Sequence, residues 1–114
     1  MKDGDLFKLL KPVLPGRVFP YLIPLTERKS DSLWCVFSTY SLTRDVLSGP
    51  AVKMTRIQVD AYAPTLERAE QIGEDALHAL NPLAPFDVEH ENSFEEDTEL
   101  YRASLTCKIY TQPR

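Results

Sequence analysis

Alternation of apolar and polar residues predicts two long β-strands, each with one buried and one solvent-facing side. They run over Val52–Tyr62 and Leu100–Thr111. Successive side chains of a strand point to opposite faces, so residues two apart share a face. The predicted buried positions are Ile57, Val59, Ala61, Tyr101, Ala103, Leu105, Cys107 and Ile109. A third stretch, Leu33–Tyr40, begins apolar on both parities and predicts a strand covered on both sides or by a partner.

Apolar residues at helical spacing predict a long helix over Thr65–Leu80, with Thr65 as its cap and Pro82 just beyond its end. Its apolar stripe is Leu66, Ala69, Ile72, Gly73, Ala76, Leu77 and Leu80. A shorter helix of about two turns is predicted over Asp5–Leu14, where Pro12 restricts the last turn.

The segments between these elements complete the predicted fold. Gly16–Pro20 has the composition of a short extended piece, and Asp45–Pro50 that of a turn joining two antiparallel strands. Part of Asp87–Phe94 is expected to form an additional strand beside the last one. Residues 1–114 therefore form a single domain of the α+β class, with a mostly antiparallel or mixed sheet and two helices packed on one face.

Composition is that of an ordinary globular domain. Of the 114 residues, 43% are hydrophobic and 26% are charged, which excludes a disordered, collagenous or coiled-coil chain. No apolar run approaches the roughly 18 residues of a membrane span, so no membrane contact is expected. The net charge of -4 argues against a protein whose function is to bind nucleic acid.

Negative charge is concentrated in one segment. Seven of the 17 acidic residues lie between Phe86 and Glu99, where there is no Lys or Arg, and the rest of the chain carries 13 basic and 10 acidic residues. This segment is either a solvated acidic loop or a charged contact surface. Because its carboxylates repel one another and Phe94 is the one apolar residue of Asn92–Asp97, that stretch is expected to be mobile in the free subunit.

Large apolar side chains are also predicted on the sheet face opposite the helices. They are Trp34, Val36, Tyr40, Met54, Tyr62 and Tyr110. So much aromatic surface needs a cover. Either the first helix or the Pro-rich segment after residue 20 covers it, or it is an interface with another subunit or partner, where aromatic residues are enriched.

No arrangement of residues indicates catalysis, and no catalytic, cofactor-binding or metal-binding residue is assigned. The four glycines are far apart, so there is no phosphate-binding loop. Cys35 and Cys107 stand alone and are expected to be reduced core residues. In the run Glu89-His90-Glu91, alternation on a strand would place His90 opposite the two carboxylates, which is a poor chelate. The chain is therefore not expected to be an enzyme.

Four segments taken in order resemble the tail-completion, or tail-terminator, proteins of long-tailed bacteriophages and prophages. They are GRVFP at residues 16–20, RIQVDAYA at 56–63, LERA at 66–69 and LYRASL at 100–105. The resemblance covers roughly residues 5 to 112. It implies a non-enzymatic subunit without a cofactor, which forms a hexameric ring at the head-proximal end of the tail tube. Such a ring stops tube polymerisation and offers a docking surface to the head connector or neck protein.

The resemblance also implies a place and a set of partners. Similar proteins assemble in the host bacterial cytoplasm and end at the head–tail junction of the virion, with DNA passing through the lumen without specific binding. The acidic segment is expected to face the lumen or an axial surface and to order when a neck or tube protein docks, with Phe94 as its anchor. Its other contact residues are Glu91, Glu95, Glu96 and Asp97.

Two other functions stay open from the residues alone. One is a neck or head-completion protein that occupies an adjacent ring position. The other is a small α+β module that binds a ligand or regulates another protein, because a fold does not set a function.

Overall fold

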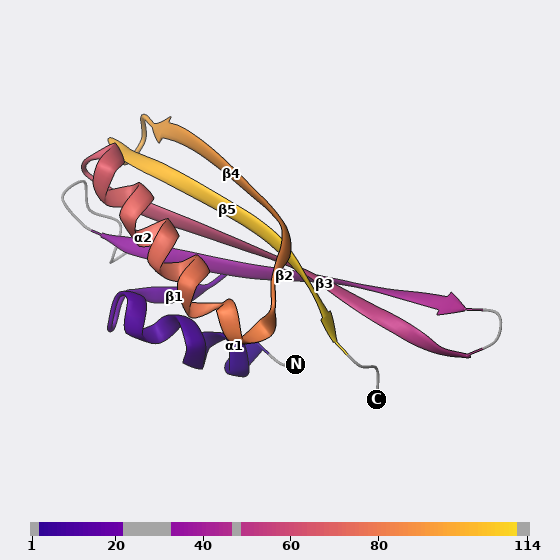
Figure 1. Ribbon diagram of the computed structural model, residues 1–114. Coiled ribbons are helices and arrows are strands. Elements are labelled where there is room, and N and C mark those ends of the chain that lie inside the picture. Colours follow the sequence, from indigo (N-terminus) through magenta and orange to yellow (C-terminus); the bar gives the residue numbers. More distant parts are fainter. Residues whose placement is uncertain (1–2, 22–32, 47–48, 112–114) are drawn as a thin grey trace.

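The computed structural model describes residues 3–21, 33–46 and 49–111 (Figure 1). The helical elements are α1 (Asp3–Leu10), the 3-10 turn η1 (Lys11–Val13), α2 (Leu66–Ala79) and the 3-10 turn η3 (Asn81–Leu83). The strands are β1 (Val18–Pro20), β2 (Trp34–Val46), β3 (Gly49–Ala63), β4 (Phe86–Glu95) and β5 (Leu100–Thr111). All of the predicted helices and strands are present, with shifts at their ends.

One five-stranded sheet holds these strands in the order β1-β2-β3-β5-β4. β1 runs parallel to β2, and every other neighbouring pair is antiparallel, so the sheet is mixed. Both α-helices lie on the same side of the sheet (Figure 1). The expected α+β fold with two helices on one face is confirmed.

The core lies between the helices and the sheet and contains the strand positions that alternation predicts, with one exception. Tyr101, expected to be buried, is 36% exposed near the start of β5, where its ring meets the exposed Phe94 of β4. Phe37, Val59, Leu105 and Ile109 are among the side chains that contribute, each no more than 1% exposed. Leu6 and Leu10 of α1 pack into the same cluster, joined by Ala69, Ile72, Ala76 and Leu80. The apolar face that alternation predicts for the strands and the apolar stripe that helical spacing predicts for α2 therefore form one layer.

The beginning and the face of α2 follow from its sequence. The Thr65 hydroxyl accepts a hydrogen bond from the backbone N–H of Arg68 at 3.2 Å, so the predicted cap is confirmed. Gly73 lies over β5, where an added Cβ would be 3.8 Å from the Cβ of Ala103. Leu77, expected in the core stripe, is only partly buried at the margin of the core. The small residues thus set how closely the helix approaches the sheet.

Replacing Gly73 by Ala is expected to stabilise the protein. The 3.8 Å separation from Ala103 is an ordinary van der Waals distance, so a methyl group fits without moving the helix. Glycine costs about 0.5–1 kcal/mol relative to alanine inside a helix, and Gly73→Ala should raise the free energy of unfolding by about that amount. Urea denaturation checks this, with Gly73→Val as the bulkier, β-branched comparison. A lower stability for Gly73→Ala would mean that the helix lies closer to β5.

The predicted extended piece at residues 16–20 becomes the edge strand β1. Gly16 has a φ of +77°, a conformation that favours glycine, and turns the chain into the strand. The N–H of Cys35 donates to the carbonyl of Arg17 at 2.9 Å, and Tyr21 N–H donates to Phe37 O at 2.7 Å. Pro20 fits because β1 is an edge strand, where one side of the ladder needs no donor.

The β2–β3 hairpin is longer than the pattern predicts. β2 continues to Val46 rather than stopping at Tyr40, and β3 begins at Gly49 rather than Val52. β5 accompanies β3 only as far as the Lys53–Thr111 pair, so the hairpin continues beyond it as two strands (Figure 1). The molecule is consequently 53 Å long and 23 Å in each of the other directions. Several residues after position 40 are polar, so their pattern does not predict a strand. The pairing between β2 and β3 stabilises the strand there instead.

The acidic segment is ordered as a strand, and the expectation of a mobile loop over residues 92–97 is wrong for residues 92–95. Those residues pair with β5 as part of β4, and a turn follows at 96–99. The basic partners missing from the local sequence come from β5: Lys108 bonds Asp87 at 2.6 Å, and Arg102 lies 3.8 Å from Glu95. Cross-strand charge pairs of this kind offset the repulsion that the linear sequence suggests.

Candidate interaction site

The sheet face turned away from the helices, called here the open face, carries all six of the predicted interface side chains. The register places the pairs Trp34–Tyr62 and Met54–Tyr110 on it, together with Val36 and Tyr40. α1 packs on the other side of the sheet, so the first helix does not cover this face. The predicted assignment of these six side chains to one face of the sheet is therefore correct.

Two of the six are already covered within the chain. Trp34 is fully buried and Tyr62 is 8% exposed, and they form a cluster with Leu100 at one end of the open face. Their ring centroids lie 5.7 Å apart, and Phe19 and Val36 pack against the cluster. Trp34 and Tyr62 are therefore core residues of a second, smaller cluster rather than interface residues. The Pro-rich segment, the other expected cover, lies at residues 22–32, outside the described residues.

The exposed members lie further along the open face. Tyr40 is 64% exposed and Tyr110 is 65% exposed, while Val36 and Met54 are half-buried. Phe86, which the sequence did not indicate, stacks on Tyr110 with ring centroids 4.7 Å apart. The register of β4 with β5 brings these rings together, and the bulge between Phe86 and Glu89 makes that register invisible in the sequence.

A polar network crosses the middle of the open face. The Ser104 hydroxyl donates to Asp60 at 2.6 Å, and the Arg102 guanidinium donates to the Ser93 hydroxyl at 3.0 Å. Burial raises the pKa of the Tyr62 phenol, and its hydrogen bond with Arg102 opposes that rise. These contacts fasten β3, β5 and β4 together, so the face is a rigid surface.

The residues predicted for the acidic docking segment are separated by the strand. Glu91 and Glu95 lie on the open face beside Ser104 and Leu100 of β5, while Glu96 and Asp97 are exposed in the following turn. Phe94 lies on the helix side, 49% exposed. Its ring meets Tyr101 edge-on, with centroids 5.0 Å apart. An exposed aromatic pair therefore lies beside an acidic turn at this end of the sheet.

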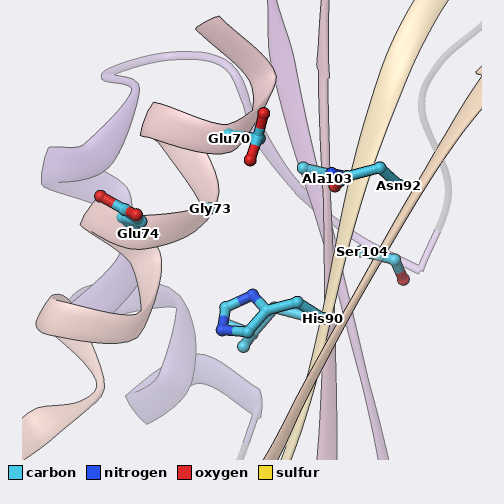
Figure 2. A pocket seen from close by; sticks show the side chains of 8 residues that line it. Glu70, Gly73, Glu74, His90, Asn92, Ala103 and Ser104 are labelled. Atoms are coloured by element: carbon cyan, nitrogen blue, oxygen red, sulfur yellow. The ribbon is translucent and has the colours of Figure 1, made fainter. Parts of the chain in front are cut away.

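A groove between α2 and β4 is a feature that the sequence analysis missed. One of its two hollows has a volume of about 230 Å³ and is lined by Glu70 and Glu74 of α2, by His90 and Asn92 of β4, and by β5. Figure 2 shows His90 reaching from β4 toward the helix. The alternation along β4 indicates which of its side chains face the helices, but not whether α2 covers them. That depends on where the helix crosses the sheet.

The groove continues along α2 as a second hollow. Its lining includes Leu77 and His78 of the helix and Val88 of β4, with His90 shared between the two hollows. α2 packs over β3 and β5, and Val88 on the helix side of β4 is 38% exposed. The described helices therefore do not extend over β4, the strand at this edge of the sheet. The groove between α2 and β4 stays open, with acidic residues of α2 along one side.

The described residues hold few groups suited to catalysis. Within residues 3–21, 33–46 and 49–111, no three or more His, Cys, Asp or Glu side chains are grouped so as to hold a metal ion. Cys35 and Cys107 are free and buried, as expected. Burial raises the pKa of the Cys35 thiol to about 12 and that of Cys107 to about 11, so both are protonated near neutral pH and are poor nucleophiles.

Comparison with known proteins gives a likeness of fold. A chain in the virion of a native gene transfer agent particle superimposes with a TM-score of 0.60, over 95% of this chain and 92% of that chain. The two sequences are 9% identical, so the likeness shows a shared fold. No family model and no curated protein matches the sequence. Neither described helix is long and apolar enough to span a membrane.

Proposed function

We propose that this protein is a structural subunit of a phage or prophage virion, which forms a ring at the head-proximal end of the tail tube. The ring ends tube polymerisation and provides the head–tail joining surface. The observation that carries the proposal is the fold shared over 95% of the chain with a component of a virion. The order of the GRVFP, RIQVDAYA, LERA and LYRASL segments supports the tail-terminator position in particular.

The surfaces of the subunit support a role in assembly rather than in catalysis. Tyr40 and Tyr110 are each about two-thirds exposed on the open face, and rings so exposed are typical of interfaces. They contact neighbouring subunits or partners, with Met54 and Val36 beside them. A subunit with a net charge of -4 surrounds DNA in the ring lumen without gripping it, because like charges repel. The protein is not an enzyme and binds no cofactor in this role.

The subunit assembles in the cytoplasm of the host bacterium and becomes part of the virion at the head–tail junction. A hexamer is the proposed state of the ring, formed on the tube or at high concentration. Electron microscopy of tail tubes polymerised with and without the protein tests this. With it, tubes should end in a ring at one end and stop growing; without it, they should be overlong and fail to join heads. Rings found only on heads would instead identify a neck or head-completion protein.

The acidic segment is proposed as the surface that docks the neck or tube protein. Phe94, packed edge-on against Tyr101, is its apolar anchor, and the carboxylates of Glu95, Glu96 and Asp97 steer the encounter with a basic partner. Glu91 on the open face adds to the same negative field.

Replacing Glu95, Glu96 and Asp97 together by Ser should slow head–tail joining without unfolding the subunit. The carboxylates act at long range, so the defect should be larger at low ionic strength, where screening is weak. Joining rates measured at two salt concentrations check this, and a thermal melt confirms the fold. A triple variant that joins at the normal rate under both conditions would contradict the steering role.

A further inference from the structure

The helix layer of this subunit has a vacant position. α1 packs beside β1 and α2 packs over β3 and β5, but no helix of the described residues packs over β4 (Figure 1). The side chains that β4 turns toward the layer are exposed, Val88 at 38% and Phe94 at 49%. Beside them runs the groove shown in Figure 2, with α2 as its wall and β4 as its floor. Grooves of this shape accept an amphipathic helix from a partner.

The acidic residues along the groove favour a partner helix that carries exposed cations. Its α2 wall carries Glu70 and Glu74, one helical turn apart and both exposed, and no Lys or Arg is among the groove's lining residues. Leu77 and Val88 supply an apolar strip along the same channel. A helix that fits would place cations against the wall and apolar side chains against the strip.

The α1–η1 segment of a second copy offers such cations. Lys8 and Lys11 are exposed on its outer side, as is Asp5, and Leu9 beside Lys8 is half-buried, whereas Phe7 packs against Phe37 in the core. The exposed side of α2, by contrast, is predominantly acidic. Of the two α-helices, α1 is therefore the one that, with η1, offers two exposed lysines to Glu70 and Glu74.

The topology keeps α1 out of the groove of its own copy, although α1 and η1 touch α2 on its other side. α1 lies at the β1 edge of the sheet and the groove lies at the β4 edge, with three strands between them. One copy must therefore supply α1 and the next copy the groove. Two different surfaces in contact form a head-to-tail interface, which closes into a ring when the rotation between copies allows.

We propose that α1 of each subunit docks in the α2–β4 groove of its neighbour, with Lys8 and Lys11 against Glu70 and Glu74. This inference rests on the proposed ring and names the contact that closes it. It leaves the Phe94–Tyr101 pair and the acidic turn free for the joining partner.

Cross-linking between two variants, each with one added surface cysteine, tests the contact directly. Lys8→Cys and Glu74→Cys each place one exposed thiol on the surface, while the native Cys35 and Cys107 are covered by the fold. An equimolar mixture treated with a short bis-maleimide at ring-forming concentration should give covalent heterodimers, and either variant alone should give at least tenfold fewer dimers. Rings without heterodimer cross-links would overturn the docking while leaving the ring function intact.

Charge reversal supplies a second and independent readout. Lys8→Glu with Lys11→Glu, and separately Glu70→Lys with Glu74→Lys, should each raise the concentration needed for half-maximal assembly by at least tenfold. In a ring where the two variants alternate, every interface pairs opposite charges, because the reversed α1 meets the reversed groove and the native α1 meets the native groove. An equimolar mixture should therefore assemble within about threefold of the unmodified protein, and a mixture no better than either variant alone would contradict the docking. The milder Lys8→Gln with Lys11→Gln keeps the test valid if the reversed helix is unstable.

The acidic turn provides the matched control. Glu96→Lys with Asp97→Lys makes the same change in net charge at a different surface, so it should impair head joining but not ring assembly. If the groove variant and this control reduced assembly equally, the docking would be wrong and net charge would explain the effect. If the unmodified protein formed no rings even on tail tubes, the ring function and the docking would both fail.

Discussion

Phe37→Ala is expected to lower the free energy of unfolding by about 3–5 kcal/mol, the largest effect of a single substitution that we expect in this fold. Phe37 is 1% exposed and lies near the start of β2, where it pairs with Pro20 of β1 on one side and with Val59 of β3 on the other. Its ring lies 6.3 Å from that of Phe7, so it joins α1 to the sheet. Removing it leaves a cavity between the helix and two strands, and the surrounding chain relaxes only in part.

Urea denaturation of Phe37→Ala beside Glu74→Ala checks this prediction. Glu74 is exposed on α2, and its truncation should change the free energy of unfolding by less than about 0.5 kcal/mol. Similar losses for the two variants would mean that the apolar layer between α1 and the sheet is not the main source of stability.

Alkaline pH should destabilise the protein steeply, and Cys35 is the principal cause. Burial raises the pKa of its thiol from 9.0 to about 12. The unfolded chain therefore ionises at lower pH than the folded chain, so the stabilisation is fully present below about pH 9 and is lost as pH rises toward 12. A difference of three pH units corresponds to about 4 kcal/mol, of which roughly 2–3 kcal/mol is lost by pH 11.

Comparison of the unmodified protein with Cys35→Ala isolates this contribution. The variant should be less stable at pH 7, because it loses a buried sulfur, but its stability should fall much less between pH 9 and pH 11. Ionisation of tyrosines and of Cys107 is common to both proteins and provides the baseline. Parallel pH profiles for the two proteins would show that the Cys35 thiol does not control the alkaline transition.

Most of the fold could be predicted from the sequence because the buried faces repeat with the period of their elements. Leu105, Cys107 and Ile109 follow one another at every second position of β5, and each is 1% exposed. Periodicity records which side of an element is buried, and that information is local. The same reasoning placed Trp34 and Tyr62 on the correct face but could not show that Leu100, far away in sequence, covers them.

The errors arise where the partner of a residue lies on another strand. The window around Glu95 contains no cation, yet Arg102 reaches it from β5. The α2–β4 groove was missed for a related reason. The groove exists because of the angle and position at which the helix crosses the sheet. Gly73 allows the helix to approach β5 closely, but it does not indicate which strands the helix leaves uncovered. Contacts between elements that are distant in sequence are not encoded in any one of their patterns.

The outer edge of β4 bears on whether free copies of the protein aggregate. An edge strand exposes unpaired backbone groups, and ten residues of such an edge would invite a second copy to add its own strand and start an aggregate. Pairing two β4 strands edge to edge would bring Glu89 and Glu91 of one copy alongside the same carboxylates of the other. Like charges opposite one another oppose that pairing. These carboxylates should therefore keep free copies of the protein dispersed.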